Sequence, residues 1–148
     1  MDGESPCALQ ATFKDKRILV VEDEAIVAML IEDELLEAGA QVLGPVGSVR
    51  DALCLVEIAA ADGGLSAAVL DINLEGGAVK PVADRLATLG IPFLFATGYG
   101  ARCDTGGHET APVLHKPFDP HELLAALSSL AFVAQRTPPS HKVAAIPP

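Results

Sequence analysis

Polar side chains follow four of the short apolar runs in this 148-residue chain, at the point where each run ends. They are Glu22 and Asp23 after the first run, then Asp71, Thr97 and Lys116 after three later ones. Three carboxylates that share one site repel each other, and the arrangement is stable only if a cation lies among them. Oxygen ligands select a hard ion, and a small open site that retains water favours Mg²⁺ over Ca²⁺. If the runs converge, this pattern predicts a Mg²⁺ site.

A lysine and a hydroxyl beside such a site indicate chemistry on a phosphoryl group. Lys116 can pair with Asp71, and the Thr97 hydroxyl can donate a hydrogen bond to an anionic oxygen. Phosphoryl transfer needs an acceptor, a metal that neutralises charge, and donors placed around the equatorial oxygens. Each of these residues alone is more often a helix cap or a solvated loop residue. The prediction therefore depends on finding all five at strand ends and in this order.

The elements that must bring these residues together alternate along the chain. Apolar runs typical of buried parallel strands lie at 18–21, 41–43, 67–70, 91–96 and 113–115. Helical spacing, caps and stop residues predict helices over 25–38, 48–61, 79–89 and 119–133. This alternation predicts a doubly wound, five-stranded parallel sheet with helices on both faces. Ligands bind beyond the carboxyl ends of the strands in such sheets, which is where the five polar residues would lie.

One segment breaks the alternation. Between Thr97 and Pro112 the chain has four glycines and no apolar stripe, although a fourth helix is expected there. We therefore predict that this helix is irregular or absent. Cys103 and His108 lie in the same segment, but two isolated ligand types do not indicate zinc, and we interpret both as ordinary loop residues.

Several other charged residues have a structural interpretation. Glu24, Asp33 and Glu34 fit the solvated face of the first predicted helix. His115 fits a strand residue, and His121 fits an exposed position in the first turn of the last helix. None of the five is expected to act in the site.

Length and composition limit the class of protein. Half of the residues are apolar and 20% are charged, which is typical of one globular domain with no room for an ordinary fused output domain. Residues 1–14 lack periodicity and 135–148 are rich in proline, so we expect a flexible tail on either side of a domain over 15–134. The net charge of −10 disfavours a nucleic-acid partner.

The cysteines and the N-terminal residues bear on location. The three cysteines are odd in number and widely spaced, with no Cys-x-x-Cys pair, which suits a reducing compartment. No run is long enough to cross a bilayer, and the N-terminus lacks the basic and apolar regions of a signal peptide. We therefore expect a cytoplasmic protein with no membrane partner.

Four motifs together resemble the response-regulator receiver domains. They are ILVVEDE at 18–24, VLDIN at 69–73, FATGYG at 95–100 and HKPF at 115–118. The resemblance spans about residues 16–134 and implies the flavodoxin-like topology of that family. Within the family, PFLFATGY at 92–99 resembles the single-domain FATGUY group, which is found mostly in alphaproteobacteria and is associated with HWE-type histidine kinases.

The resemblance implies a role for each polar residue. Asp71 would be the phosphoacceptor, taking a phosphoryl group from a sensor histidine kinase. Glu22 and Asp23 would hold Mg²⁺, and the backbone carbonyl of Asn73 would complete the metal shell. Lys116 would pair with Asp71 and then with the phosphate. The protein would be a signalling domain rather than an enzyme, although it would assist its own phosphotransfer and dephosphorylation.

The resemblance also implies a switch. Thr97 would move toward the phosphoryl oxygen, and the surface formed by the 98–112 segment, the fifth strand and the last helix would shift with it. Many receivers have an inward-rotating aromatic residue three positions before the lysine, but Val113 stands there. We therefore advance the hypothesis that Tyr99, the only tyrosine, takes over part of the gating; a ring that merely shields the loop is the equal alternative.

Two other functions are compatible with parts of the pattern. Haloacid-dehalogenase-type phosphohydrolases also use a strand-end aspartate with Mg²⁺, but they need a second aspartate two residues later, where this chain has Asn73. A degenerate receiver that binds partners without phosphorylation is the other alternative. The sequence does not identify the signal, the cognate kinase or the downstream protein, nor does it choose among protein binding, phosphoryl relay and a phosphate sink.

Overall fold

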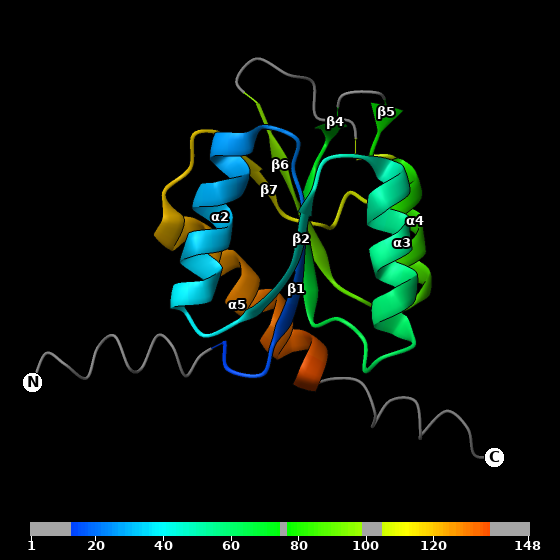
Figure 1. The fold of residues 1–148 in the computed structure, drawn as a ribbon, viewed down its shortest axis with the longest axis horizontal. Helices are drawn as coiled ribbons and strands as arrows, with labels where there is room; N and C mark the ends of the chain where they lie inside the picture. The colour runs from blue at the N-terminus through cyan, green and yellow to red at the C-terminus, as the bar shows by residue number, and fades with distance from the viewer. Residues whose placement is uncertain (1–12, 75–76, 99–104, 137–148) are drawn as a thin grey trace, which may run out of the picture.

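The computed structural model describes residues 13–74, 77–98 and 105–136. Five parallel strands form a sheet in the order β2-β1-β3-β6-β7, and a helical layer covers each face (Figure 1). The strands are β1 (Arg17–Val21), β2 (Gln41–Val46), β3 (Ala67–Asp71), β6 (Phe93–Thr97) and β7 (Val113–His115). The helices are α2 (Ala25–Glu37), α3 (Val49–Ala60), α4 (Lys80–Thr88) and α5 (Pro120–Arg136). This is the predicted doubly wound receiver topology.

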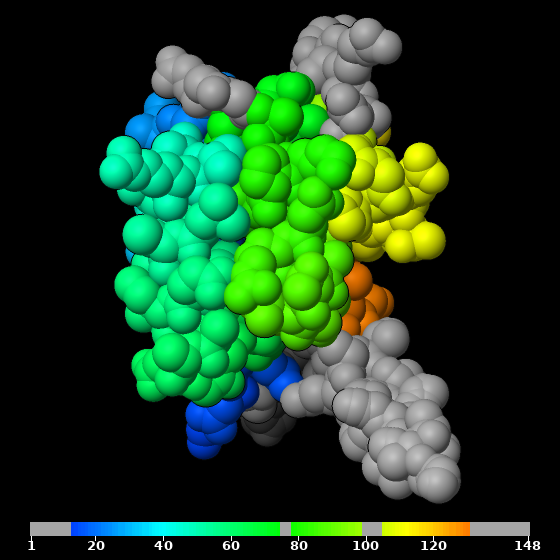
Figure 2. Space-filling view, turned by 90° about the vertical axis from the view of Figure 1, so that its right-hand side faces the viewer, coloured from blue at the N-terminus to red at the C-terminus, as the bar shows by residue number. Residues whose placement is uncertain are grey.

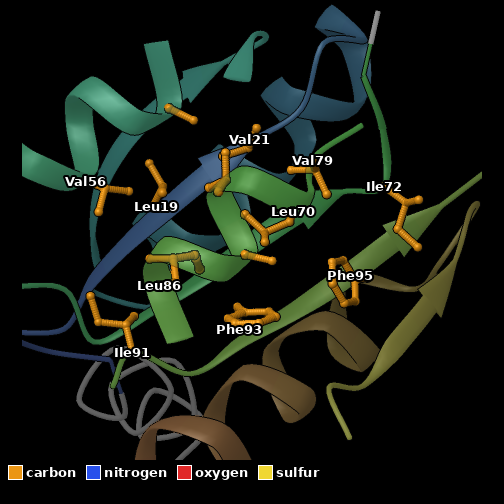
Figure 3. Packing of buried hydrophobic residues seen from close by; sticks show 14 of the residues in the cluster. Leu19, Val21, Val56, Leu70, Ile72, Val79, Leu86, Ile91, Phe93 and Phe95 are labelled. Carbon is orange, nitrogen blue, oxygen red and sulfur yellow. The ribbon is translucent and has the colours of Figure 1, made fainter. Parts of the chain in front are cut away.

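The sheet is buried on both faces because its central strands are aliphatic at nearly every position. Successive side chains of a strand point to opposite faces, so each strand supplies two cores. Leu19, Leu70 and Phe95 pack with α3 and α4 on one face (Figure 3). Val20 and Leu94 pack with α2 and α5 on the other. No helix in the described ranges is long and apolar enough to cross a membrane.

Strand register aligns the ends of the strands at one edge of the sheet. Val21 pairs with Leu70, so Glu22 and Asp71 are the next residues on neighbouring strands. Asp71 in turn pairs with Ala96, and Thr97 pairs with His115. The residues that follow these strands therefore reach the same edge, as the sequence pattern predicts.

Three features were not expected. A short antiparallel hairpin, β4 (Asn73–Leu74) and β5 (Gly77–Ala78), follows β3. Strand β2 continues to Val46 past Gly44, whose φ is 94° and where a Cβ would lie 2.8 Å from the carbonyl oxygen of Val20. Phe13, within the segment expected to be a tail, is 1% exposed and packs in the α2–α5 core.

The segment between β6 and β7 is irregular where it is described. Residues 105–112 form turns and bends without a helix, which agrees with the prediction for that part of the segment. Residues 99–104, including Tyr99 and Cys103, lie outside the described residues, so the gating hypothesis for Tyr99 stays a prediction.

Candidate functional site at the carboxyl edge of the sheet

Polar side chains are buried at this edge of the sheet. In the described part of the chain, the buried polar or charged residues are Glu22, Asp71 and Thr97, which are 3%, 4% and 0% exposed. Charged side chains are almost never buried unless they are paired or coordinate a metal. Their place at the ends of β1, β3 and β6 marks this edge as the candidate site.

Three carboxylates form a candidate metal centre. One oxygen from each of Glu22, Asp23 and Asp71 lies within 4.8 Å of the others. The donor set is oxygen only, which suits a hard divalent cation. Burial, with repulsion from Asp71 added, raises the pKa of Glu22 to about 7 although Lys116 opposes the rise. Negative charge is therefore under-compensated here, and the residues fit a cation such as Mg²⁺.

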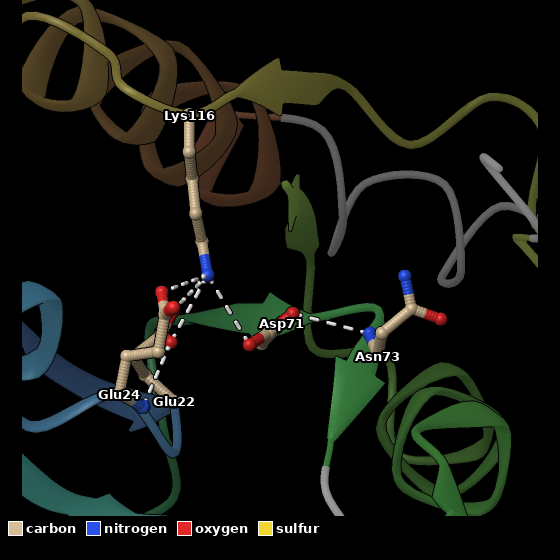
Figure 4. Close-up of polar contacts among 5 residues, drawn as sticks. All are labelled: Glu22, Glu24, Asp71, Asn73 and Lys116. Carbon is tan, nitrogen blue, oxygen red and sulfur yellow. Dashed lines mark hydrogen bonds and ion pairs between the residues drawn. The ribbon is translucent and has the colours of Figure 1, made fainter. Parts of the chain in front are cut away.

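The ammonium group of Lys116 lies between the carboxylates (Figure 4). Its Nζ is 3.0 Å from Glu22, 3.2 Å from Oδ2 of Asp71 and 3.3 Å from Oε1 of Glu24. Burial alone would lower the pKa of Lys116, but hydrogen bonds and charge attraction from Glu22 and Asp71 outweigh it and raise that pKa. Lys116 is therefore held in its charged form. The following Lys116–Pro117 peptide bond is cis.

The Asp71 carboxylate is fixed from both sides. Oδ1 accepts a hydrogen bond from the backbone N–H of Asn73 at 3.1 Å, while Oδ2 faces Lys116. The side chain of Asn73 is exposed and points away from Asp71 (Figure 4). The backbone N–H of Asn73, rather than its side-chain amide, thus orients the Asp71 carboxylate.

The hydroxyl of Thr97 is buried without a hydrogen-bond partner among the described residues. Such a group costs free energy unless a ligand or a rearrangement satisfies it. Thr97 directly follows Ala96, the residue that pairs with Asp71. This orphaned donor at the end of β6 suits an oxygen-bearing group at Asp71.

The structure therefore brings Glu22, Asp23, Asp71 and Lys116 together and places Thr97 at the end of the adjacent strand. Sequence reasoning missed Glu24, which it interpreted as solvated helix face. Glu24 is indeed exposed but contacts Lys116. Its position directly after Glu22 and Asp23 on the same edge was the available signal.

Comparisons with known proteins support the same assignment. No protein-family profile matches the sequence. SdrG from Sphingomonas melonis Fr1, whose solution structure is known, is 42% identical in sequence to this chain. The two structures superpose with a TM-score of 0.66, and the match covers 80% of this chain and 97% of SdrG. A response regulator receiver protein from Sinorhizobium medicae WSM419 is 27% identical, with a TM-score of 0.68, over 81% of this chain and 97% of that one.

A curated relative is longer than this chain. The phyllosphere-induced regulator PhyR of Methylorubrum extorquens is 33% identical over 121 residues, which are 80% of this chain and 44% of that protein. The chain thus spans less than half the length of PhyR. Together with the strand order and the carboxylate–lysine cluster, these similarities show that the chain belongs to the response-regulator receiver domains.

Proposed function

We propose that the chain is a phosphoacceptor receiver of a two-component or phosphorelay system, which accepts a phosphoryl group on Asp71 and signals by phosphorylation-dependent protein binding. The environment of Asp71 carries this proposal. Its carboxylate is buried at a strand end, 3.2 Å from Nζ of Lys116, with two further carboxylates beside it. That combination of nucleophile, cation and metal ligands is what phosphoryl transfer requires.

In the proposed reaction, a carboxylate oxygen of Asp71 attacks the phosphorus of a phosphohistidine. A P–O bond forms, the P–N bond to the kinase imidazole breaks, and the products are an acyl phosphate on Asp71 and a free imidazole. Lys116 pairs with one phosphoryl oxygen and the Thr97 hydroxyl donates to another. Lys116 already lies 3.2 Å from Asp71 before the reaction, whereas the Thr97 hydroxyl, at the end of the adjacent strand, would move toward the phosphoryl group.

Mg²⁺ is part of the proposal. Its ligands would be Glu22, Asp23, Asp71 and the backbone carbonyl of Asn73, and it would neutralise charge on the transferring group. We expect Mg²⁺ to raise the melting temperature, because it relieves carboxylate repulsion in the folded state only. Asp23→Ala should abolish that rise, while Glu37→Ala, an exposed change at the far end of α2, should retain it. An equal rise in both variants would exclude this site.

The proposed donor is a sensor histidine kinase of the HWE type, in keeping with the resemblance of residues 92–99 to the FATGUY group. A donor protein must contact the surface around Asp71 to deliver its phosphoryl group. Exposed apolar residues are present there on α2, where Ile26 is 72% and Leu30 58% exposed. An apolar hollow of about 140 Å³ lies between α2 and the segment around Phe118, with Lys116 in its lining. These features support this face as the kinase-binding surface.

The proposed output is a shift of the surface formed by residues 105–112, β7 and α5. The orphaned hydroxyl of Thr97 supports it, because a hydrogen bond to the phosphoryl group would pull the end of β6, which pairs with β7. A differential affinity of a few kcal/mol is enough for such a population shift. Tyr99 is proposed to share in this switch.

The decisive experiment incubates the protein with Mg²⁺ and acetyl phosphate and measures the intact mass of the wild type and of Asp71→Asn. We expect an acid-labile phosphoryl adduct on the wild type alone. Absence of the adduct, with a known receiver as a positive control, would refute the proposal and leave a phosphorylation-independent binding domain. Repeated hydrolysis of many phosphomonoesters would instead identify a phosphohydrolase.

A further inference from the structure

All three N–H donors of the Lys116 ammonium have a carboxylate within reach. Nζ lies 3.0 Å from Glu22, 3.2 Å from Asp71 and 3.3 Å from Glu24. An ammonium group has three donors and no acceptor. A phosphoryl oxygen that arrives at Asp71 therefore meets a lysine whose donors are already in use, and one carboxylate must be displaced.

Burial decides which carboxylate leaves. The side chain of Glu22 is 1% exposed and that of Glu24 is 62% exposed. A buried carboxylate that loses its partner stays without solvent, whereas an exposed one is rehydrated at once. Asp71 is the attacking group, and Lys116 must keep its contact with Asp71 while the phosphoryl group approaches, so the donor for the phosphoryl oxygen has to come from one of the two glutamates. Glu24 is the partner that Lys116 releases at least cost.

The backbone at Glu24 is well placed for such a role. Its N–H donates to Oε2 of Glu22 at 3.1 Å, and its carbonyl accepts from the N–H of Ala28 at 2.9 Å. Glu24 precedes α2 and its side chain makes no capping hydrogen bond to the helix. The main chain is therefore fixed at the mouth of the site while the side chain remains free to turn into solvent.

We propose that Glu24 is a positioning residue for phosphorylation of Asp71: its carboxylate occupies one donor of Lys116 at rest and is displaced by the incoming phosphoryl group. This inference rests on the proposed phosphoacceptor function. Because the wild type must break the contact, its removal should speed phosphorylation. The usual strength of exposed ion pairs corresponds to an increase of about two- to fivefold.

The test measures phosphorylation rates with acetyl phosphate and saturating Mg²⁺ in Glu24→Gln, with Glu37→Gln as the control. Glu37 is an exposed carboxylate on the same helix, so its loss changes the net charge equally. We expect a gain for Glu24→Gln alone. The same substitution in a Lys116→Ala background, with its fold confirmed by circular dichroism, should give no gain. A gain that persists without Lys116 would overturn the inference, because it would reflect simple charge repulsion of the donor.

A second variant removes the dependence on Lys116→Ala. Glu24→Asp keeps the charge and shortens the side chain by one methylene, so it should resemble Glu24→Gln if contact with Lys116 matters and the wild type if charge alone matters. The latter result would contradict the inference. No adduct on the wild type would refute the proposed function itself, whereas equal rates in all variants would refute only the role of Glu24.

Displacement can also be observed directly. The ¹³C shift of the Glu24 carboxyl group should move toward that of Glu37 when BeF₃⁻ is added as a phosphoryl mimic to the Mg²⁺-loaded protein. BeF₃⁻ is an appropriate probe because a BeF₃-activated conformation of SdrG, 43% identical to this chain, has been solved. An unchanged Glu24 signal, in a sample whose Thr97 resonance responds to BeF₃⁻, would show that Lys116 keeps Glu24 and would overturn the inference.

Discussion

Two groups of charges in this molecule use the same chemistry under different solvation. At the carboxyl edge of the sheet, Lys116 lies 3.0 to 3.2 Å from the buried carboxylates of Glu22 and Asp71. On the surface of α4, Asp84 is 2.7 Å from both Lys80 and His108. The surface contacts are shorter, yet the Asp84 side chain is 46% exposed and that of Glu22 only 1%. Burial, rather than contact length, should rank their energies.

The surface group fastens the irregular segment that replaces a helix. Nε2 of His108 contacts Asp84, and its ring packs edge-on against Phe93 with centroids 5.3 Å apart. Gly106 passes so close to Lys80 that a Cβ atom added at Gly106 would lie 2.9 Å from Cγ of Lys80. Figure 2 shows this segment, in yellow, against α4, in green. The charges at the carboxyl edge (the edge group: Glu22, Asp71 and Lys116) thus form the candidate site, whereas the charges on α4 hold a loop.

The largest loss of stability should come from Lys116→Ala, measured in the presence of a metal chelator. Without the ammonium group, Glu22 and Asp71 remain buried and uncompensated, so unfolding free energy should fall by about 3–5 kcal/mol. Urea denaturation measures the loss, and Mg²⁺ should recover part of it by supplying another cation. A loss below about 1 kcal/mol would mean that the contacts of Lys116 are worth no more than exposed ion pairs, and would contradict the difference expected between buried and exposed charges.

The two groups should also give pH dependences of opposite sign. Burial raises the pKa of Glu22 to about 7, so its protonated form stabilises the folded state at acid pH and the benefit is lost as pH rises through that value. Lys80 first, and then His108, lower the pKa of Asp84, so its contribution is present at neutral pH and is lost as pH falls through the lowered pKa.

The measurement compares metal-free wild type with Glu22→Gln and with Asp84→Asn across pH. The stability of the wild type relative to Glu22→Gln should decline between the ordinary carboxylate range and about pH 7. Relative to Asp84→Asn it should instead decline only toward acid pH. Two differences that slope in the same direction would contradict the contrast.

A smaller, local effect is expected from Asp84→Asn at neutral pH. The substitution loosens the 105–112 segment without exposing a core residue, so global stability should hardly change. Amide exchange should accelerate at His108 and Ala111, whose N–H groups bond to carbonyls within that segment. Exchange at Leu94, in the core of β6, serves as the control. Equal acceleration at Leu94 would mean that the contact supports the whole fold.

The residues of the edge group could be predicted from sequence because one simple rule places them. Aliphatic runs indicate parallel strands, and the carboxyl ends of such strands share an edge, so Glu22, Asp71 and Lys116 converge without any knowledge of loops. The limits of the helices could be predicted because helical spacing and stop residues are also local patterns. Helix α4, for example, covers Lys80–Thr88, where these patterns predicted 79–89.

The remaining features depend on contacts that local patterns do not encode. The contact of Glu24 with Lys116 joins residues 92 positions apart. Strands β4 and β5 have two residues each, too few to show an alternation. The burial of Phe13 rests on one isolated aromatic residue, which has no periodicity to detect. Sequence patterns thus predicted which residues converge at the candidate site better than they predicted the contacts around it.

The smallest effect should come from the pair that looks strongest by geometry. Arg85 contacts Glu57 with two nitrogens, at 2.6 and 3.0 Å, and links α4 to α3. A hydrogen bond from Arg85 lowers the pKa of Glu57, yet the two side chains are 38% and 52% exposed, and water can replace either partner. We expect Glu57→Gln to leave the urea midpoint unchanged at about 0.15 M salt and to lower it slightly at about 0.01 M, where screening is weak. If Glu57→Gln instead cost as much as Lys116→Ala, bidentate geometry rather than burial would rank the charges of this protein.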